Sequence, residues 1–262
     1  MVLAKDRAEN RVEDSSVEDD PIALAAEPVV DIPLPPTDLY SDEPPLESDL
    51  HLRQILLLIT SLEWLWEERN DFFASGNLTV YFSPKQLKSR DFRGPDFLVV
   101  LDTERRTRKS WTVWEEDGKY PNVIVEILSD STAKVDRTTK KKLYQDTFRL
   151  PEYFWFDPVS LEFAGFLLVG GEYEPIAANE KGQLWSRQLN LYLGIHEEQL
   201  RYFTAEGTLV LSPTEIARES QQTATESQKT AMEAQRTATE SQKKAERLAE
   251  RLRELGVDPD TV

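Results

Sequence analysis

The chain has no cysteine and only two histidines, His51 and His196, among its 262 residues. The lack of cysteine excludes disulfides and thiolate metal sites, and it is compatible with a reducing compartment. Two histidines are too few for a zinc site built from imidazole groups. The sequence also lacks a serine–histidine motif and a glycine-rich phosphate loop, so neither serine catalysis nor P-loop nucleotide binding is indicated.

Long apolar runs are absent as well, because none approaches the roughly 18 residues that a membrane span requires. The N-terminus has no basic start followed by an apolar core, as a secretory signal would have. We therefore expect a soluble, cytoplasmic protein without a membrane partner.

The net charge of −17 is unevenly distributed. Residues 1–50 carry 14 acids and 3 bases, whereas residues 51–213 carry 24 acids and 20 bases. A strongly acidic protein is repelled by a phosphate backbone. Because most of the acidity lies near the N-terminus, the middle of the chain can still present a basic surface to nucleic acid.

Composition divides the chain into residues 1–47, 48–212 and 213–262. The first part mixes acids with prolines and has only short apolar pieces, which predicts a disordered acidic arm. We interpret this arm either as a solubilising tail or as a segment that competes with nucleic acid for a basic groove. The aromatic residues gather in the second part, where we place one globular domain.

The middle part has the pattern of a mixed α/β domain. Apolar residues recur at spacings of three and four after Ser48, as in a core-facing helix. Short β-branched and aromatic runs predict strands. The expected strands are 78–82, 96–102, 123–128 and 153–157, then a hairpin of 161–169 with 172–176, then short strands in 189–195 and 200–210, with a second helix over 137–148.

Two acids stand out in this pattern. Asp96 opens one strand, and Glu126 interrupts the apolar run 123–128, which we expect to be a central strand covered on both faces. Burying two neighbouring carboxylates is costly unless a cation compensates their charge. Carboxylate oxygens suit Mg²⁺ or Mn²⁺, so the pair predicts a metal-dependent hydrolytic site. The alternative for Glu126 is an edge strand that turns its side chain to water.

A basic helix follows, in which Asp136, Lys140 and Tyr144 share one face at a spacing of four. We expect Asp136 to cap this helix. A lysine near a metal-activated water could stabilise charge on a phosphate or orient the attacking nucleophile. The alternative is a surface ion pair between Asp136 and Lys140, which would contribute roughly a few tenths of a kcal/mol.

These segments together resemble the Uma-two family of restriction endonucleases, within the PD-(D/E)XK nuclease superfamily. The resemblance covers about residues 75–262. Gly94-Pro95-Asp96 is similar to the PD element, and Val125 to Ser129 is similar to the acidic strand motif. Asp136 to Lys140, residues 150–158 and residues 249–260 are similar to the helix, the next strand and the charged tail of the family. The resemblance implies a restriction-endonuclease-like fold and a metal-dependent endonuclease that acts on DNA.

The resemblance also implies roles for individual residues. Asp96 and Glu126 would bind Mg²⁺ or Mn²⁺, and the Ile127 carbonyl would be a third ligand. The superfamily places its lysine two residues after the glutamate, where this chain has Leu128. The catalytic lysine is therefore expected on the helix, where Lys140 matches the family position and Lys142 is the alternative.

Basic side chains near these motifs are candidates for contact with nucleic acid. Three of them lie in the loop between the first two expected strands, and two lie on the basic helix. They are Lys88, Arg90, Arg93, Lys141 and Lys142.

The last part of the chain has a heptad repeat over residues 219–255. Its expected seam contains alanine and serine until Leu248, Leu252 and Leu255. Such small residues bury little area per turn, so two interpretations stay open. The helix either joins copies of the chain as a coiled coil or stands alone in solvent.

Two functional hypotheses follow. The first is a Mg²⁺-dependent DNA endonuclease. The second is a nuclease-fold module without catalytic activity, which binds nucleic acid or protein and assembles through the C-terminal helix.

Overall fold

The computed structural model describes residues 39–41, 46, 48–83, 94–256, 258 and 259. The predicted arm, residues 1–47, lies almost entirely outside the described residues, so its predicted disorder stays a prediction. Three of the basic residues expected to contact nucleic acid, Lys88, Arg90 and Arg93, lie outside them as well.

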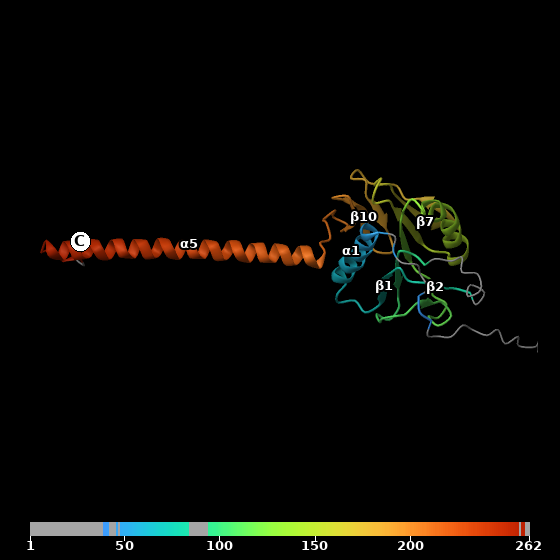
Figure 1. The fold of residues 1–262 in the computed structure, drawn as a ribbon, viewed down its shortest axis with the longest axis horizontal. Coiled ribbons are helices and arrows are strands. Elements are labelled where there is room, and N and C mark those ends of the chain that lie inside the picture. The colour runs from blue at the N-terminus through green and yellow to red at the C-terminus, as the bar shows by residue number, and fades with distance from the viewer. Residues whose placement is uncertain (1–38, 42–45, 47, 84–93, 257, 260–262) are drawn as a thin grey trace, which may run out of the picture. The chain divides into compact units, whose positions relative to one another are not determined.

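A six-stranded mixed sheet forms the centre of the domain (Figure 1). In spatial order its strands are β1 (Phe72–Gly76), β3 (Phe97–Leu101), β5 (Val123–Ile127), β6 (Glu152–Phe156), β7 (Phe163–Val169) and β8 (Glu172–Pro175). The strands β5 and β6 are parallel, whereas all the other neighbours are antiparallel. The sheet flanked by helices confirms the predicted fold class, and β5 lies inside the sheet rather than at its edge.

One face of the sheet is covered by helix α1 (Asp49–Leu65) and by a small antiparallel sheet. The small sheet contains β9 (Leu184–Ser186), β10 (Leu191–His196) and β11 (Gln199–Phe203). Gln54 of α1 exchanges two hydrogen bonds with the backbone of Leu200 at 2.9 and 3.0 Å. These bonds satisfy a buried amide and fix α1 against β11.

The opposite face is covered by a helical run over residues 133–148 and by a short parallel strand pair. The run contains α3 (Ala133–Val135), η1 (Asp136–Lys140), α4 (Lys141–Leu143) and η2 (Tyr144–Phe148). The strand pair is β2 (Val80–Tyr81) with β4 (Trp111–Thr112). Both η segments are π-helical, a rare conformation that is frequent at functional sites.

Two local predictions were wrong. The first strand of the sheet is β1, which lies before the expected strand 78–82, and only Val80 and Tyr81 of that expected strand pair with a neighbour. The second helical run begins at Ala133, so Asp136 lies inside it rather than capping it. The residue at the N-terminal boundary is Thr132.

Helix α5 (Pro213–Glu254) confirms the long C-terminal helix. Its N-terminus carries a capping box in which Ser212 and Glu215 bond each other's backbone, with Pro213 in the first turn. Arg201 of β11, which is buried, makes two contacts of 2.9 and 2.6 Å with Glu215 and connects the helix start to the domain. No helix in the described part of the chain is both long and apolar enough to span a membrane.

Candidate active site

Asp96 and Glu126 lie opposite each other at one end of the paired strands β3 and β5. Phe97 pairs with Val125 in this antiparallel ladder, so the next positions outward are Asp96 and Glu126. The Asp96 N–H donates to Oε2 of Glu126 at 3.3 Å, and the Ile127 N–H donates to Oδ2 of Asp96 at 2.8 Å. Each carboxylate thus accepts a backbone N–H from the opposite strand, which fixes the two acids side by side.

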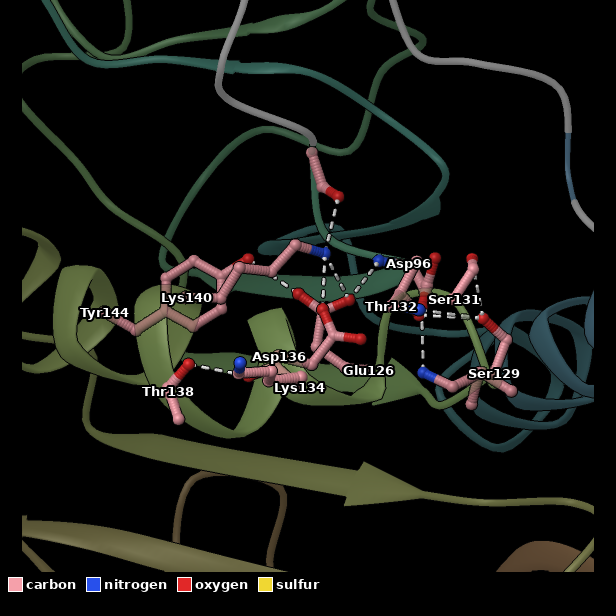
Figure 2. Close-up of polar contacts among 12 residues, drawn as sticks. Asp96, Glu126, Ser129, Ser131, Thr132, Lys134, Asp136, Thr138, Lys140 and Tyr144 are labelled. Atoms are coloured by element: carbon pink, nitrogen blue, oxygen red, sulfur yellow. Dashed lines mark hydrogen bonds and ion pairs between the residues drawn. The ribbon is translucent and has the colours of Figure 1, made fainter.

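Lys140 reaches this pair from the helical run (Figure 2). Its Nζ lies 2.9 Å from Oε2 of Glu126 and 3.1 Å from Oδ1 of Asp136. The Tyr144 hydroxyl donates to Oε1 of Glu126 at 2.7 Å. The structure therefore brings together Asp96, Glu126 and Lys140, the three residues that the sequence predicted as catalytic.

The helical run faces the sheet with Asp136, Lys140 and Tyr144, all three of which are buried. The Tyr153 hydroxyl of β6 donates to the Asp136 carbonyl at 2.9 Å and attaches the run to the sheet. Because Asp136 is only 1% exposed, its pair with Lys140 is not the surface ion pair considered as an alternative.

Three acids surround one lysine in this cluster, of which Glu126 and Asp136 are buried and Asp96 is partly exposed, so carboxylates outnumber cations. Burial raises the pKa of Glu126 well above its usual value, and the charges of Asp96 and Asp136 add to that effect while Lys140 opposes it. Burial also raises the pKa of Asp136, which Lys140 again opposes. Although burial acts in the same direction on Asp96, the side chains of His51 and Lys140 hold its pKa below the usual value.

Lys140 keeps its proton in this environment. Burial alone would lower the pKa of its ammonium group, but the neighbouring acids Glu126, Asp136 and Asp96 outweigh that effect and raise it above the usual value. The side chain is therefore a fixed positive charge at neutral pH rather than a base.

His51 was not predicted as a site residue, yet its Nε2 lies 3.0 Å from Oδ1 of Asp96. The Ser48 hydroxyl caps α1 by accepting the His51 N–H at 3.1 Å, which fixes the first turn of the helix. A histidine near the start of a helix does not by itself predict a contact with a distant aspartate. Only the packing of α1 on the sheet brings His51 to Asp96, 45 residues further along the chain.

The remaining predicted residues lie in different surroundings. Lys141 packs over the ring of Phe166, with Nζ 3.3 Å from the ring centroid, so its charge faces an aromatic side chain. Lys142 is exposed, whereas Lys140 is buried beside Glu126. Ile127 donates its backbone N–H to Oδ2 of Asp96. That its carbonyl binds a metal ion stays a prediction.

The donor chemistry at Asp96 and Glu126 fits a hard divalent cation. Among the described residues, no three His, Asp or Glu side chains are already arranged around a metal position. Mg²⁺ is usually held by only one or two carboxylates, with waters and substrate oxygens completing its shell. The carboxylate of Asp136 is buried nearby, with Lys140 Nζ 3.1 Å from its Oδ1, and the excess of acids over Lys140 favours an additional positive charge.

Comparison with protein families assigns the chain. A family model named Uma2 and described as "Putative restriction endonuclease" matches residues 38–206. The chain belongs to the Uma2 family. This is the Uma-two family whose motifs the segments around Asp96, Glu126 and Lys140 resembled, so that identification is confirmed.

Curated proteins and solved structures give two further comparisons. No curated protein matches the chain. Among solved structures, the crystal structure of "a putative nuclease belonging to DUF820" from Anabaena variabilis ATCC 29413 is similar to it, with 15% sequence identity and a TM-score of 0.40. The similar region covers 55% of this chain and 76% of that chain.

Proposed function

We propose that this Uma2 family member is a metal-dependent endonuclease that hydrolyses phosphodiester bonds in DNA. The observation that carries the proposal is the contact between Lys140 and Glu126, beside Asp96. This contact supplies a lysine to the acid pair from a helix, although the strand has Leu128 where the superfamily has its lysine. The family assignment supports a nuclease, whereas the metal, the DNA substrate and the residue roles are inferred from the chemistry of the cluster.

Asp96 and Glu126 would hold Mg²⁺ or Mn²⁺ through their carboxylate oxygens. The bound ion would lower the pKa of a water molecule and neutralise charge on the scissile phosphate. Asp96 is suited to meet a ligand because its side chain is 15% exposed, whereas Glu126 is fully buried behind it. The Ile127 N–H orients the Asp96 carboxylate, and the Tyr144 hydroxyl orients that of Glu126.

Lys140 would act as an electrostatic group. Because the surrounding acids keep it protonated, it cannot accept a proton from water in this state, but it can stabilise negative charge that develops on a phosphate. Its contacts with Glu126 and Asp136 hold the ammonium group in place before substrate binds, so little reorganisation is needed during the reaction.

The test is a plasmid-nicking assay with full-length protein and Mg²⁺, compared with the same assay in excess chelator. We expect cleavage that requires the metal and falls by about a hundredfold or more in Asp96→Ala and in Glu126→Gln. The exposed acid Asp146 provides a matched control, because Asp146→Ala should cleave like the parent. Equal cleavage by the parent and both site variants would contradict the assignment of this site.

A nuclease-fold module without activity is the second candidate. One observation favours it, because both acids already have partners within the protein. Asp96 accepts the Ile127 N–H, and Glu126 is bound by Lys140 and by the Tyr144 hydroxyl. A protein that binds DNA but shows no metal-dependent cleavage under any divalent cation would support this candidate and exclude the endonuclease.

A further inference from the structure

Strand β1 forms one edge of the large sheet and lacks the features that usually protect such an edge. Among the described residues only β3 pairs with it. Its sequence, Phe-Phe-Ala-Ser-Gly, contains neither a charged residue nor a proline. An edge strand without charge or proline presents its backbone groups to any extended chain that can reach them.

The backbone of β1 directs alternate N–H groups toward the open side. The Asn77 N–H, directly after the strand, donates to the Asp96 carbonyl on the β3 side at 3.0 Å. Successive residues of an antiparallel pair alternate between bonding the neighbouring strand and facing away from it. The N–H and carbonyl groups of Ala74 and Gly76 therefore face away from β3, and both residues are partly exposed.

A hollow of about 360 Å³ follows this open side. It is lined by the four consecutive residues 72–75 of β1. Because neighbouring side chains of a strand point to opposite faces of the sheet, a hollow that touches all four runs along the edge rather than over one face. Within it Ala74 and Ser75 are partly exposed, whereas Phe72 and Phe73 are buried. The hollow thus gives an added chain access to the β1 backbone at Ala74.

Arginines form the other wall of the hollow. Arg105, Arg106 and Arg108 line it, and Glu63 of α1 is the only acid among the described residues that do so. Arg106 and Arg108 are already paired with Glu116, at 2.8 and 2.6 Å. Arg105 differs, because the one carboxylate near it among the described residues is that of Glu63, 3.9 Å from Nη2. Its side chain is 31% exposed, so Arg105 can receive a further acid.

Contacts on its other side hold the Arg105 guanidinium in place. Its Cζ lies 4.9 Å from the centroid of the Phe72 ring. Nη1 donates to three backbone carbonyls at the end of α1, at 3.4, 3.2 and 3.3 Å, which are those of Trp66, Glu67 and Arg69. These contacts leave Nη2 for a ligand. A hydrogen bond between a guanidinium and a carboxylate is roughly twice as strong as one between neutral groups.

We propose that the open edge of β1 is a docking site for an extended, acidic segment of a partner protein. The segment would add to the sheet beside Ala74 and Gly76 through backbone hydrogen bonds, and one of its carboxylates would bind Arg105. A second copy of β1 does not fit this description, because the strand has no acid to offer. The inference does not depend on the proposed function, since it uses no residue of the candidate active site.

The experiment uses the full chain, labelled with ¹⁵N, and a short acetylated peptide in which valine and glutamate alternate. Amide hydrogen exchange is followed by NMR. With the peptide at about ten times its Kd, exchange at Ala74 and Gly76 should slow by about tenfold, because the bound state protects these N–H groups. A peptide in which lysine replaces glutamate is the control, and it should give no protection.

Two matched comparisons locate the binding mode. N-methylation removes donors from one side of an extended peptide, so methylation at one set of alternate residues should abolish binding and methylation at the other set should not. In Arg105→Gln, affinity for the acidic peptide should fall by about tenfold or more, because a hydrogen bond to a charged group is lost. Lys142→Gln, an equal loss of charge at an exposed position, should bind like the parent. The methylated peptides are tested on the unaltered chain, so that result does not depend on whether Arg105→Gln folds.

Several outcomes would overturn the docking site. They are no binding of the acidic peptide, equal binding of the lysine peptide, and equal binding of both methylated peptides. Slow exchange at Ala74 and Gly76 before any peptide is added would show that the chain itself covers the edge. Protection that rises with protein concentration alone would show that a second copy does so, and either result would also overturn the proposal. Plasmid cleavage is not measured here, so a failure of the endonuclease proposal is a separate result.

Discussion

Lys140 Nζ lies 2.9 Å from Oε2 of Glu126, although the two residues belong to a helix and a strand and are 14 positions apart. In the superfamily pattern the acid and the lysine share one strand, whereas here the strand position is Leu128. The buried acids keep Lys140 charged, and Lys140 in turn makes their burial tolerable. The pair therefore stabilises the domain and also lies at the centre of the proposed site.

Substituting this lysine should affect both properties. In Lys140→Gln we expect cleavage to fall by about 10²- to 10³-fold. Thermal unfolding should show a loss of about 3–5 kcal/mol, since buried acids lose their cation. The exposed neighbour provides the control, because Lys142→Gln should retain both cleavage and stability. Normal activity in Lys140→Gln with a loss in Lys142→Gln would transfer the role to Lys142.

Removing the Tyr144 hydroxyl tests how Glu126 is oriented. In Tyr144→Phe the buried Oε1 of Glu126 loses its donor, which typically costs about 1–3 kcal/mol of unfolding free energy. Denaturant unfolding measures this loss. The exposed Tyr40 offers a matched control, because its hydroxyl is not buried against an acid and Tyr40→Phe should leave stability unchanged. Equal stability of Tyr144→Phe and the parent would show that the hydroxyl does not support Glu126.

Gly76 should resist substitution even by alanine. A Cβ there would clash with Ile55 and approach the Asp96 carbonyl to 2.9 Å, so α1 must move away from the sheet. Overpacking of this kind typically costs about 1–3 kcal/mol. Chemical denaturation of Gly76→Ala should show this loss, whereas Gly182→Ala, at an open turn, measures the cost of a left-handed glycine without any clash. A smaller loss at Gly76 than at Gly182 would argue against the close approach.

The contact between Arg201 and Glu215 predicts a pH dependence of stability. The Arg201 guanidinium is the main cause that lowers the pKa of Glu215 from 4.5 to about 2 in the folded protein. A lowered pKa in the folded state stabilises the protein above pH 4.5, and this contribution disappears as pH falls from about 4.5 to about 2. Thermal unfolding of the parent and of Glu215→Gln should therefore differ at neutral pH and converge in acid. A difference that does not change with pH would mean that the ion pair contributes nothing.

The heptad repeat on α5 predicts self-association. Leu248 and Leu255 are 58% and 68% exposed in the single chain, as seam residues of a coiled coil would be before assembly. Light scattering should show concentration-dependent oligomers that disappear in a chain ended after Ser220, which keeps the Glu215 contact with Arg201. The double variant Leu248→Glu, Leu255→Glu should have the same effect. A monomeric parent at all concentrations would support the solvated single helix.

The sequence predicted the residues whose signal is local. Glu126 stood out because an acid within an apolar strand is rare, and Lys140 followed from helical spacing and the family motif. His51 and Gly76 gave no such signal, because the contacts that they make depend on how closely α1 packs against the sheet. The π-helical turns and the strand β1 were missed for the same reason, since tertiary packing rather than local preference selects them.

The far edge of the large sheet also limits how the protein can associate. Among the described residues only β7 pairs with β8, whose Tyr173 N–H donates to Oε1 of Gln145 at 2.9 Å, and β8 carries the exposed acids Glu172 and Glu174 and ends at Pro175, which has no N–H to donate. Charge and proline at an edge prevent other strands from adding to it. These features disfavour continuation of the sheet into a neighbouring copy at β8 and lower the tendency of a domain rich in apolar strands to aggregate through this edge.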